Sequence, residues 1–164
     1  MRGFVAGVLL GLGLAGSAHA GEFDDPKALL TSLFAPYTHG QKPADLEQYY
    51  TDWLKAEFAQ HMQKAEIGGV GMPPDPKLAQ QADFDPFVSD KHYLLMDLAI
   101  GDPVIQGDRA LVMVSYKNFD QPRELSVSLR QGPDGWKVDD VASMGPGPHW
   151  LLSWLLTYDP LGTL

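Results

Sequence analysis

The sequence predicts an α+β fold in which helices near the amino terminus pack on a curved, four-stranded antiparallel sheet and a short helix follows at the carboxyl end. Two segments before residue 65 carry apolar residues at helical spacing. After residue 92 apolar and polar residues alternate and short turns separate the segments, a pattern typical of neighbouring antiparallel strands. A sheet with one apolar face must be covered, and the preceding helices supply that cover.

The first twenty residues are predicted to be an export signal. Arg2 precedes an apolar and glycine run at 4–16, and Ala18-His19-Ala20 forms a small-x-small cleavage site. A membrane anchor is the alternative, but the run is shorter than the roughly 20 apolar residues of a spanning helix. We expect cleavage after Ala20 and a single domain over 21–164 without a membrane span. An exported chain without cysteine indicates the bacterial periplasm.

The chain is strongly acidic. It has 12 Lys+Arg against 21 Asp+Glu, and removal of the signal takes away Arg2, so the mature net charge is 11 − 21 = −10. Nucleic acid and anionic lipid surfaces are poor partners for such a chain, because phosphate groups are bound mainly by clustered Lys and Arg, and no nucleic-acid partner is predicted. The absence of cysteine excludes thiol catalysis and cysteine-based zinc sites.

Two helices open the predicted domain. Asp24-Asp25-Pro26 is typical of a helix start, and Pro36 ends the apolar pattern that follows. A second and longer amphipathic helix is predicted over Pro43–Lys64. The Gly- and Pro-rich segment 67–90 is predicted to be a surface loop. Within it, Phe84 and Phe87 are expected to pin the Asp85-Pro86 turn onto the domain, or alternatively to line the mouth of a cavity.

The strands follow in order. Tyr93–Ile105 is interrupted at 101–103, and Gly107-Asp108 is a hairpin turn that leads into Arg109–Asn118. Glu124–Arg130 alternates without fault, and the turn at 132–135 places the strand that begins at Trp136 beside it. These short connections predict an antiparallel meander.

The alternation fails at Asp139-Asp140. Trp136 and Val138 mark the buried face of the last strand, so one of the two carboxylates would face the core in a regular strand. A bulge is the favoured interpretation, because an Asp at such a point commonly accepts a hydrogen bond from a nearby backbone N–H and the bulge returns Val141 to the core.

The carboxyl-terminal segment predicts a short, very apolar helix from His149 to about Thr157. We expect Leu152 and Leu156 to be the exposed members of this helix. Its outer face is either buried within the monomer or an interaction surface for a second subunit or an envelope protein. The inward stripe is predicted to comprise Trp150, Leu151, Trp154, Leu155 and Tyr158.

Three motifs carry a family resemblance. "DFDPF" at 83–87 with Asp90, "GDRALVMVSY" at 107–116 and "GWKVDDV" at 135–141 resemble the nuclear-transport-factor-two-like (cystatin-like) superfamily, and in particular its bacterial envelope branch of unknown function. The resemblance covers about residues 25–158. It implies a cone in which the concave sheet and the long helix enclose an apolar cavity. In different relatives that cavity houses an isomerase, a dehydratase, a ligand site or nothing, so the fold alone does not define the chemistry.

The resemblance suggests a set of cavity-lining residues. Asp140 is the alternative catalytic base, in an isomerase or dehydratase with tyrosine donors, but its structural role in the bulge is favoured. No cofactor is predicted. The expected partner is a hydrophobic small molecule or an envelope protein, and a homodimer is a further alternative. The candidate ligand-binding residues are Tyr50, Trp53, Phe87, Tyr116, Trp136 and Asp140.

No metal site is predicted. The histidines at 39, 61, 92 and 149 fall on four different elements, and no His-Glu-x-x-His spacing occurs. Glu57 and His61 are expected to form a surface pair along the second helix. The sequence therefore predicts a periplasmic, non-catalytic binding or protein-interaction module. An isomerase or dehydratase is one alternative, and an effector-neutralising or envelope-complex partner is the other.

Overall fold

A computed structural model of the chain describes residues 23–67, 85–88 and 92–158. The predicted export signal and most of the predicted loop at 67–90 lie outside the described residues. None of the helices in the described ranges is long and apolar enough to cross a bilayer.

The first helix begins and ends as predicted. Helix α1 covers Pro26–Phe34, and the side chain of Asp25 caps it by accepting a hydrogen bond from the N–H of Ala28. A 3-10 turn, η1, follows at Pro36–His39. The helix therefore ends just before Pro36, whose missing N–H cannot continue the α-helical hydrogen bonds.

The long helix begins later than predicted. Helix α2 covers Asp52–Ile67, and the preceding residues form a 3-10 turn, η2, at Glu47–Tyr49 and then an extended segment at Tyr50. The N–H of Thr51 donates to the carbonyl of Val138 at 2.9 Å, and Tyr50 forms a bridge with the same strand residue. Pairing with an edge strand thus replaces the helical hydrogen bonds that the sequence pattern predicts for this segment.

The sheet is an antiparallel meander, as predicted. Its strands are β1 (Leu95–Ile100), β2 (Val104–Gln106), β3 (Arg109–Asn118), β4 (Gln121–Gly132) and β5 (Gly135–Ser143). The spatial order is β1-β3-β4-β5, and β2 also pairs with β3, so β1 and β2 form one edge interrupted at 101–103.

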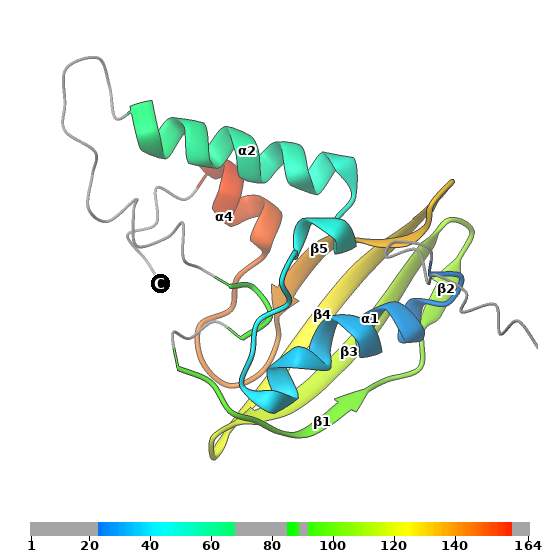
Figure 1. Cartoon of the computed structure of the whole chain (residues 1–164), viewed down its shortest axis with the longest axis vertical. Coiled ribbons are helices and arrows are strands. Elements are labelled where there is room, and N and C mark those ends of the chain that lie inside the picture. The colour runs from blue at the N-terminus through cyan, green and yellow to red at the C-terminus, as the bar shows by residue number, and fades with distance from the viewer. Residues whose placement is uncertain (1–22, 68–84, 89–91, 159–164) are drawn as a thin grey trace, which may run out of the picture.

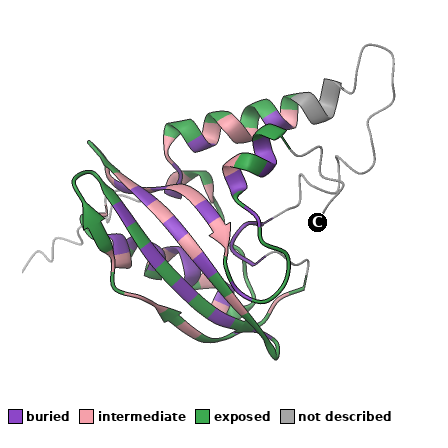
Figure 2. Ribbon diagram, turned by 180° about the vertical axis from the view of Figure 1, so that it is seen from behind, coloured by how far each residue is buried: buried purple, intermediate pink, exposed green. Residues whose placement is uncertain are grey.

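Helix α1 covers one face of the sheet, and the opposite face is open (Figures 1 and 2). Residues of β3 alternate strictly between exposed and buried, which places Val112 and Val114 in the core and Leu111 and Met113 on the open face. The core joins α1, the covered sheet face, α2 and the carboxyl-terminal helix in one cluster. The predicted α+β fold, with helices on an open antiparallel sheet, is confirmed.

The carboxyl-terminal helix, α4, covers Leu152–Tyr158 and packs against α2 (Figure 1). The prediction for this segment holds in part. Trp150 and Leu155 are buried as expected, but Leu152 and Leu156 are buried as well, whereas Leu151, Trp154 (52%) and Tyr158 (71%) are exposed. A contact of 3.3 Å between Nδ1 of His61 and the carbonyl oxygen of Leu156 joins α4 to α2.

The predicted surface pair of Glu57 and His61 is also replaced by contacts with α4. His61 is buried, and the hydroxyl of Thr157 donates to Glu57 at 3.2 Å. Both residues therefore join the two helices rather than stabilising α2 alone.

Candidate functional site

The two adjacent acids form a β-bulge, as predicted. Ser128 pairs with Asp140 while Leu129 pairs with Val138, which leaves Asp139 as the extra residue on β5. Val141 returns to the core and is fully buried.

The carboxylate of Asp140 holds the start of α4. One oxygen accepts from the N–H of Val141 at 2.9 Å and from the N–H of Ser153 at 3.0 Å. The other oxygen accepts from the hydroxyl of Ser153 at 2.6 Å. Both oxygens are thus engaged in local structure, in the manner of a helix cap supplied by a neighbouring strand.

The other predicted ligand residues are distributed over two places. Tyr50, Phe87 and Tyr116 meet in the core: the rings of Tyr50 and Phe87 stack at 6.2 Å, and the hydroxyl of Tyr116 donates to the carbonyl of Phe87 at 2.6 Å. Trp136 is buried closer to the amino-terminal segment, where its backbone N–H donates to the carbonyl oxygen of Phe23. Trp53 is 47% exposed. Ligand binding by the six residues as one set stays a prediction.

A buried carboxylate anchors the segment around Phe87. Asp85 accepts from the hydroxyl of Tyr37 at 2.7 Å and from the N–H of Phe87 at 3.0 Å, and Lys42 lies 3.6 Å away. Phe87 is fully buried, so the predicted pinning of this turn is confirmed for its described part. Burial, with the nearby Asp85 charge as a further cause, raises the pKa of Tyr37 and of Tyr50 far above the ordinary value.

A groove of about 610 Å³ lies between the start of α2 and the β4–β5 turn. We call it the Trp53 groove. The sequence predicted only Tyr50 and Trp53 as members of a binding site here. The groove is lined by Tyr50, Thr51, Asp52, Trp53, Lys55, Arg130, Gly132, Pro133, Asp134, Gly135, Lys137 and Asp139.

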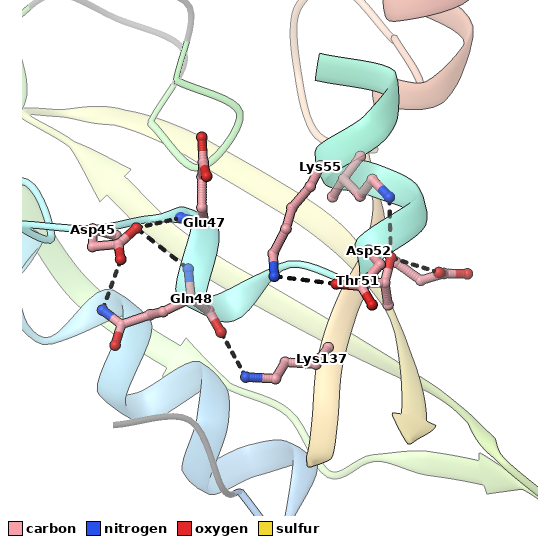
Figure 3. Close-up of polar contacts among 9 residues, drawn as sticks. Asp45, Glu47, Gln48, Thr51, Asp52, Lys55 and Lys137 are labelled. Carbon is pink, nitrogen blue, oxygen red and sulfur yellow. Dashed lines mark hydrogen bonds and ion pairs between the residues drawn. The ribbon is translucent and has the colours of Figure 1, made fainter. Parts of the chain in front are cut away.

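Local contacts fix one wall of the groove (Figure 3). The ammonium of Lys137 donates to the carbonyl of Gln48 at 2.6 Å, and Asp45 accepts from the N–H groups of Glu47 and Gln48 to hold that turn. Desolvation, with the nearby Lys55 charge as a further cause, lowers the pKa of Lys137.

The same wall carries Arg130, the cross-strand partner of Lys137, and Asp139 of β5. The hydroxyl of Thr51 donates to one oxygen of Asp139 at 3.0 Å. The Nε atom of Arg130 lies 3.6 Å from the other oxygen, which is an ion-pair distance but beyond a hydrogen bond. This Nε atom is itself buried and has no hydrogen-bond partner among the described residues.

Among the described residues, no group of three or more His, Asp or Glu side chains is placed to hold a metal ion. The charged groups of the Trp53 groove are instead arranged as cation–carboxylate neighbours, for example Lys55 and Asp52 at 3.3 Å. Such a surface is suited to recognition by hydrogen bonds and ion pairs.

Comparisons with known proteins support the fold and leave the family open. No protein-family model matches the chain, and no curated protein matches its sequence. The chain is similar to a chain in the crystal structure of the type VI native effector–immunity complex Tae3–Tai3 from Ralstonia pickettii, with a TM-score of 0.50 and 18% identity. The match covers 77% of this chain and 100% of that one. At this identity the likeness shows the fold alone, and the nuclear-transport-factor-two-like resemblance stays a prediction.

Proposed function

We propose that this chain is a non-catalytic, immunity-type protein that binds and neutralises a secreted effector in the bacterial envelope. The observation that carries the proposal is the fold match, because the chain spans the whole length of a chain from an effector–immunity complex. We infer that the matched chain is the immunity partner, Tai3. This function is the effector-neutralising alternative that the sequence suggested.

The engagement of Asp140 supports a non-catalytic role. A general base must reach a substrate proton, and both oxygens of this carboxylate are already hydrogen-bonded to the start of α4. The predicted aromatic residues Tyr50, Phe87 and Tyr116 pack against one another in the core. The outer surface is therefore the better candidate for binding.

Exposed aromatic residues support protein binding at that surface. Trp53 on α2 and Trp154 and Tyr158 on α4 are exposed, and Trp and Tyr are the residue types that most often dominate the binding energy of protein interfaces. The acidic net charge of −9 favours a basic partner and faster association with it.

We infer export to the periplasm from the predicted signal at 1–20. An immunity-type protein must meet its effector in the compartment where the effector acts. The absence of cysteine makes the fold independent of oxidation, so the exported chain needs no disulfide for stability.

The test is binding of purified chain 21–164 to a panel of purified effectors. The panel contains Tae3 from Ralstonia pickettii and the type VI effectors of the organism that carries this chain. Size-exclusion chromatography with light scattering is expected to show a discrete complex with one effector, and calorimetry a submicromolar Kd. Tai3 with Tae3 serves as the positive control, and failure of the chain to bind every effector on the panel would contradict the proposal.

A cell assay separates neutralisation from mere binding. The bound effector is directed to the periplasm of a laboratory host together with this chain, either with or without residues 1–20. Growth is expected to be rescued only by the exported form. Rescue that did not depend on residues 1–20 would contradict the envelope location.

A further inference from the structure

We propose that the Trp53 groove is the effector-binding site and that it receives an effector loop whose acidic side chain is clamped by Arg130. This inference rests on the proposed function and adds the surface and the chemistry of the contact. The groove joins the first turn of α2 to the β4–β5 turn, so two separate elements hold its walls.

The shape of the groove suits a protruding segment. Its volume of about 610 Å³ lies within the range of about 300–1,000 Å³ typical of ligand pockets, and is larger than a single carboxylate requires. Trp53 in its lining is 47% exposed, and Pro133 adds further exposed apolar surface. A few residues of a loop can therefore bury apolar side chains here while one polar group reaches inward.

Arg130 defines the polar group that fits. Its side chain lines the groove, is 43% exposed and makes no hydrogen bond to another described residue. The Nε is covered and forms an ion pair with Asp139 at 3.6 Å, while the other oxygen of Asp139 accepts from Thr51. An incoming group would therefore meet the two terminal nitrogens of the guanidinium. A carboxylate is the group that a guanidinium binds best, through two parallel hydrogen bonds.

The net charge of the groove does not attract a carboxylate, so the positions of the individual charged groups decide where a carboxylate binds. The lining contains three cations, Lys55, Arg130 and Lys137, and three carboxylates, at 52, 134 and 139, so its formal charge is 3 − 3 = 0. Lys137 already donates to Gln48, and Lys55 already contacts Asp52. Arg130 is the cation of this set that lacks a hydrogen bond within the described residues, so an incoming carboxylate is directed to it.

The first experiment measures effector affinity by calorimetry for three variants and two controls. Arg130→Gln and Trp53→Ala are each expected to weaken binding at least tenfold, while Arg130→Lys, which keeps the charge but loses the planar fork, gives an intermediate loss. The matched controls are Arg123→Gln, on the same strand outside the groove, and Phe119→Ala, which removes a 49% exposed aromatic side chain in the β3–β4 turn. Both controls are expected to bind within twofold of the unmodified chain.

Folding of each variant is checked by its urea midpoint. The substitution at Arg130 removes the partly exposed ion pair with Asp139, so the midpoint is expected to fall slightly without loss of the fold. Unchanged effector affinity in both Arg130→Gln and Trp53→Ala would overturn the inference and leave the proposed function in place. Equal affinity of Arg130→Lys and the unmodified chain would overturn the two-bond clamp.

The second experiment uses small probes and needs no effector. The peptide acetyl-Gly-Glu-Gly-amide is titrated against labelled chain and compared with acetyl-Gly-Gln-Gly-amide, while the indole N–H resonance of Trp53 is followed by NMR. A shift with the Glu peptide that disappears in Arg130→Gln supports carboxylate recognition. Equal shifts with both peptides, or no shift with either, would overturn it. If the peptide binds but the chain binds no effector, then both the proposed function and the assignment of an effector loop to the groove are wrong.

Discussion

At the scale of single residues, the two acids at 139 and 140 have different structural tasks. Asp139 is the extra residue of the bulge and accepts from Thr51 at the start of α2, whereas Asp140 accepts from Ser153 at the start of α4. One irregularity in β5 thereby positions the first turns of two helices. The bulge is best understood as the feature that orients both helices toward the sheet edge.

Removal of the Asp140 carboxylate is expected to destabilise the chain. Asp140→Ala deletes three hydrogen bonds, including the cap of α4, and we expect a loss of about 2–3 kcal/mol in the free energy of unfolding. Urea unfolding checks this value. The control is Asp102→Ala, which removes a side chain that is 95% exposed and should leave the urea midpoint nearly unchanged. Equal effects of the two substitutions would contradict the capping role.

The buried tyrosines predict a loss of stability in alkali. The folded pKa values of Tyr37 and Tyr50 lie above the ordinary value of 10.0, so the stabilisation is complete below pH 10 and is lost as the pH rises beyond it. Each tyrosine contributes a slope of about 1.4 kcal/mol per pH unit there. Urea midpoints at pH 9, 10, 11 and 12 measure the slope, and Tyr37→Phe should remove about half of it. A stability that stayed flat to pH 12 would contradict the burial of these hydroxyls.

The bulge could be predicted from sequence because alternation is a local rule and Asp139-Asp140 breaks it visibly. The Trp53 groove could not, because its walls come from distant parts of the chain: Lys137 and Gln48, which contact each other beside it, are 89 residues apart. The only predicted site residues in its lining were Tyr50 and Trp53, which were expected to line an apolar cavity. A single exposed tryptophan cannot be distinguished from a core one by spacing alone.

At the scale of elements, the β4–β5 turn is held by the amino-terminal segment. Gly135 has φ of +83°, and a Cβ atom there would lie 2.5 Å from the carbonyl oxygen of Phe23. The carbonyl oxygen of Phe23 also accepts a hydrogen bond from the backbone N–H of Trp136 at 2.8 Å. Only glycine permits both the conformation and the close approach.

Gly135→Ala is therefore expected to be more costly than Gly107→Ala. Gly107 also has a positive φ, +62°, but a Cβ atom there meets nothing within 4 Å, so alanine costs only about 1 kcal/mol from the backbone. At Gly135 the clash with Phe23 adds to this, and we expect about 2–4 kcal/mol in total. Urea unfolding of both variants gives the difference. If the two costs were the same, the Phe23 segment would not lie against the turn.

Two element predictions failed for the same physical reason. Helix α2 begins later than predicted because the N–H of Thr51 donates to the edge strand β5. Helix α4 packs against α2 with Leu152 and Leu156 buried, although these two were predicted to be exposed. Both choices are made by tertiary contacts. Apolar residues occupy both sides of α4, so the sequence pattern alone favoured the larger aromatic residues, although Leu152 and Leu156 are the residues buried.

The free edge of the sheet is protected by its irregularity. β1 and β2 are separated at 101–103, which includes Pro103, and the register of β1 shifts between Met96 and Ala99. Asp97 lies at this shift with φ of +54° and pairs with Lys117 at 2.7 Å. A short, bulged and charged edge resists pairing with another chain, which favours binding through side chains in the groove over strand addition.

At the scale of the whole molecule, the net negative charge of the chain does not extend to the proposed binding groove. The chain carries a net charge of −9, yet the Trp53 groove is formally neutral. The overall charge sets solubility and the rate of approach to a basic partner, and the groove sets which loop fits. Salt should therefore change the association rate of the complex more than its dissociation rate.

The continuous core predicts that the described elements unfold together. Buried side chains from α1, the sheet, α2 and α4 belong to one cluster, so no element has a core of its own. Far-UV circular dichroism and tryptophan fluorescence should give coincident urea transitions. Leu152→Ala, which creates a cavity at a fully buried position of α4, should lower both midpoints equally and cost about 3 kcal/mol. If this substitution instead split the transitions, α2 and α4 would form a separate unit. The Trp53 groove would then join two independently unfolding parts, and its walls would not be rigid enough to clamp a carboxylate.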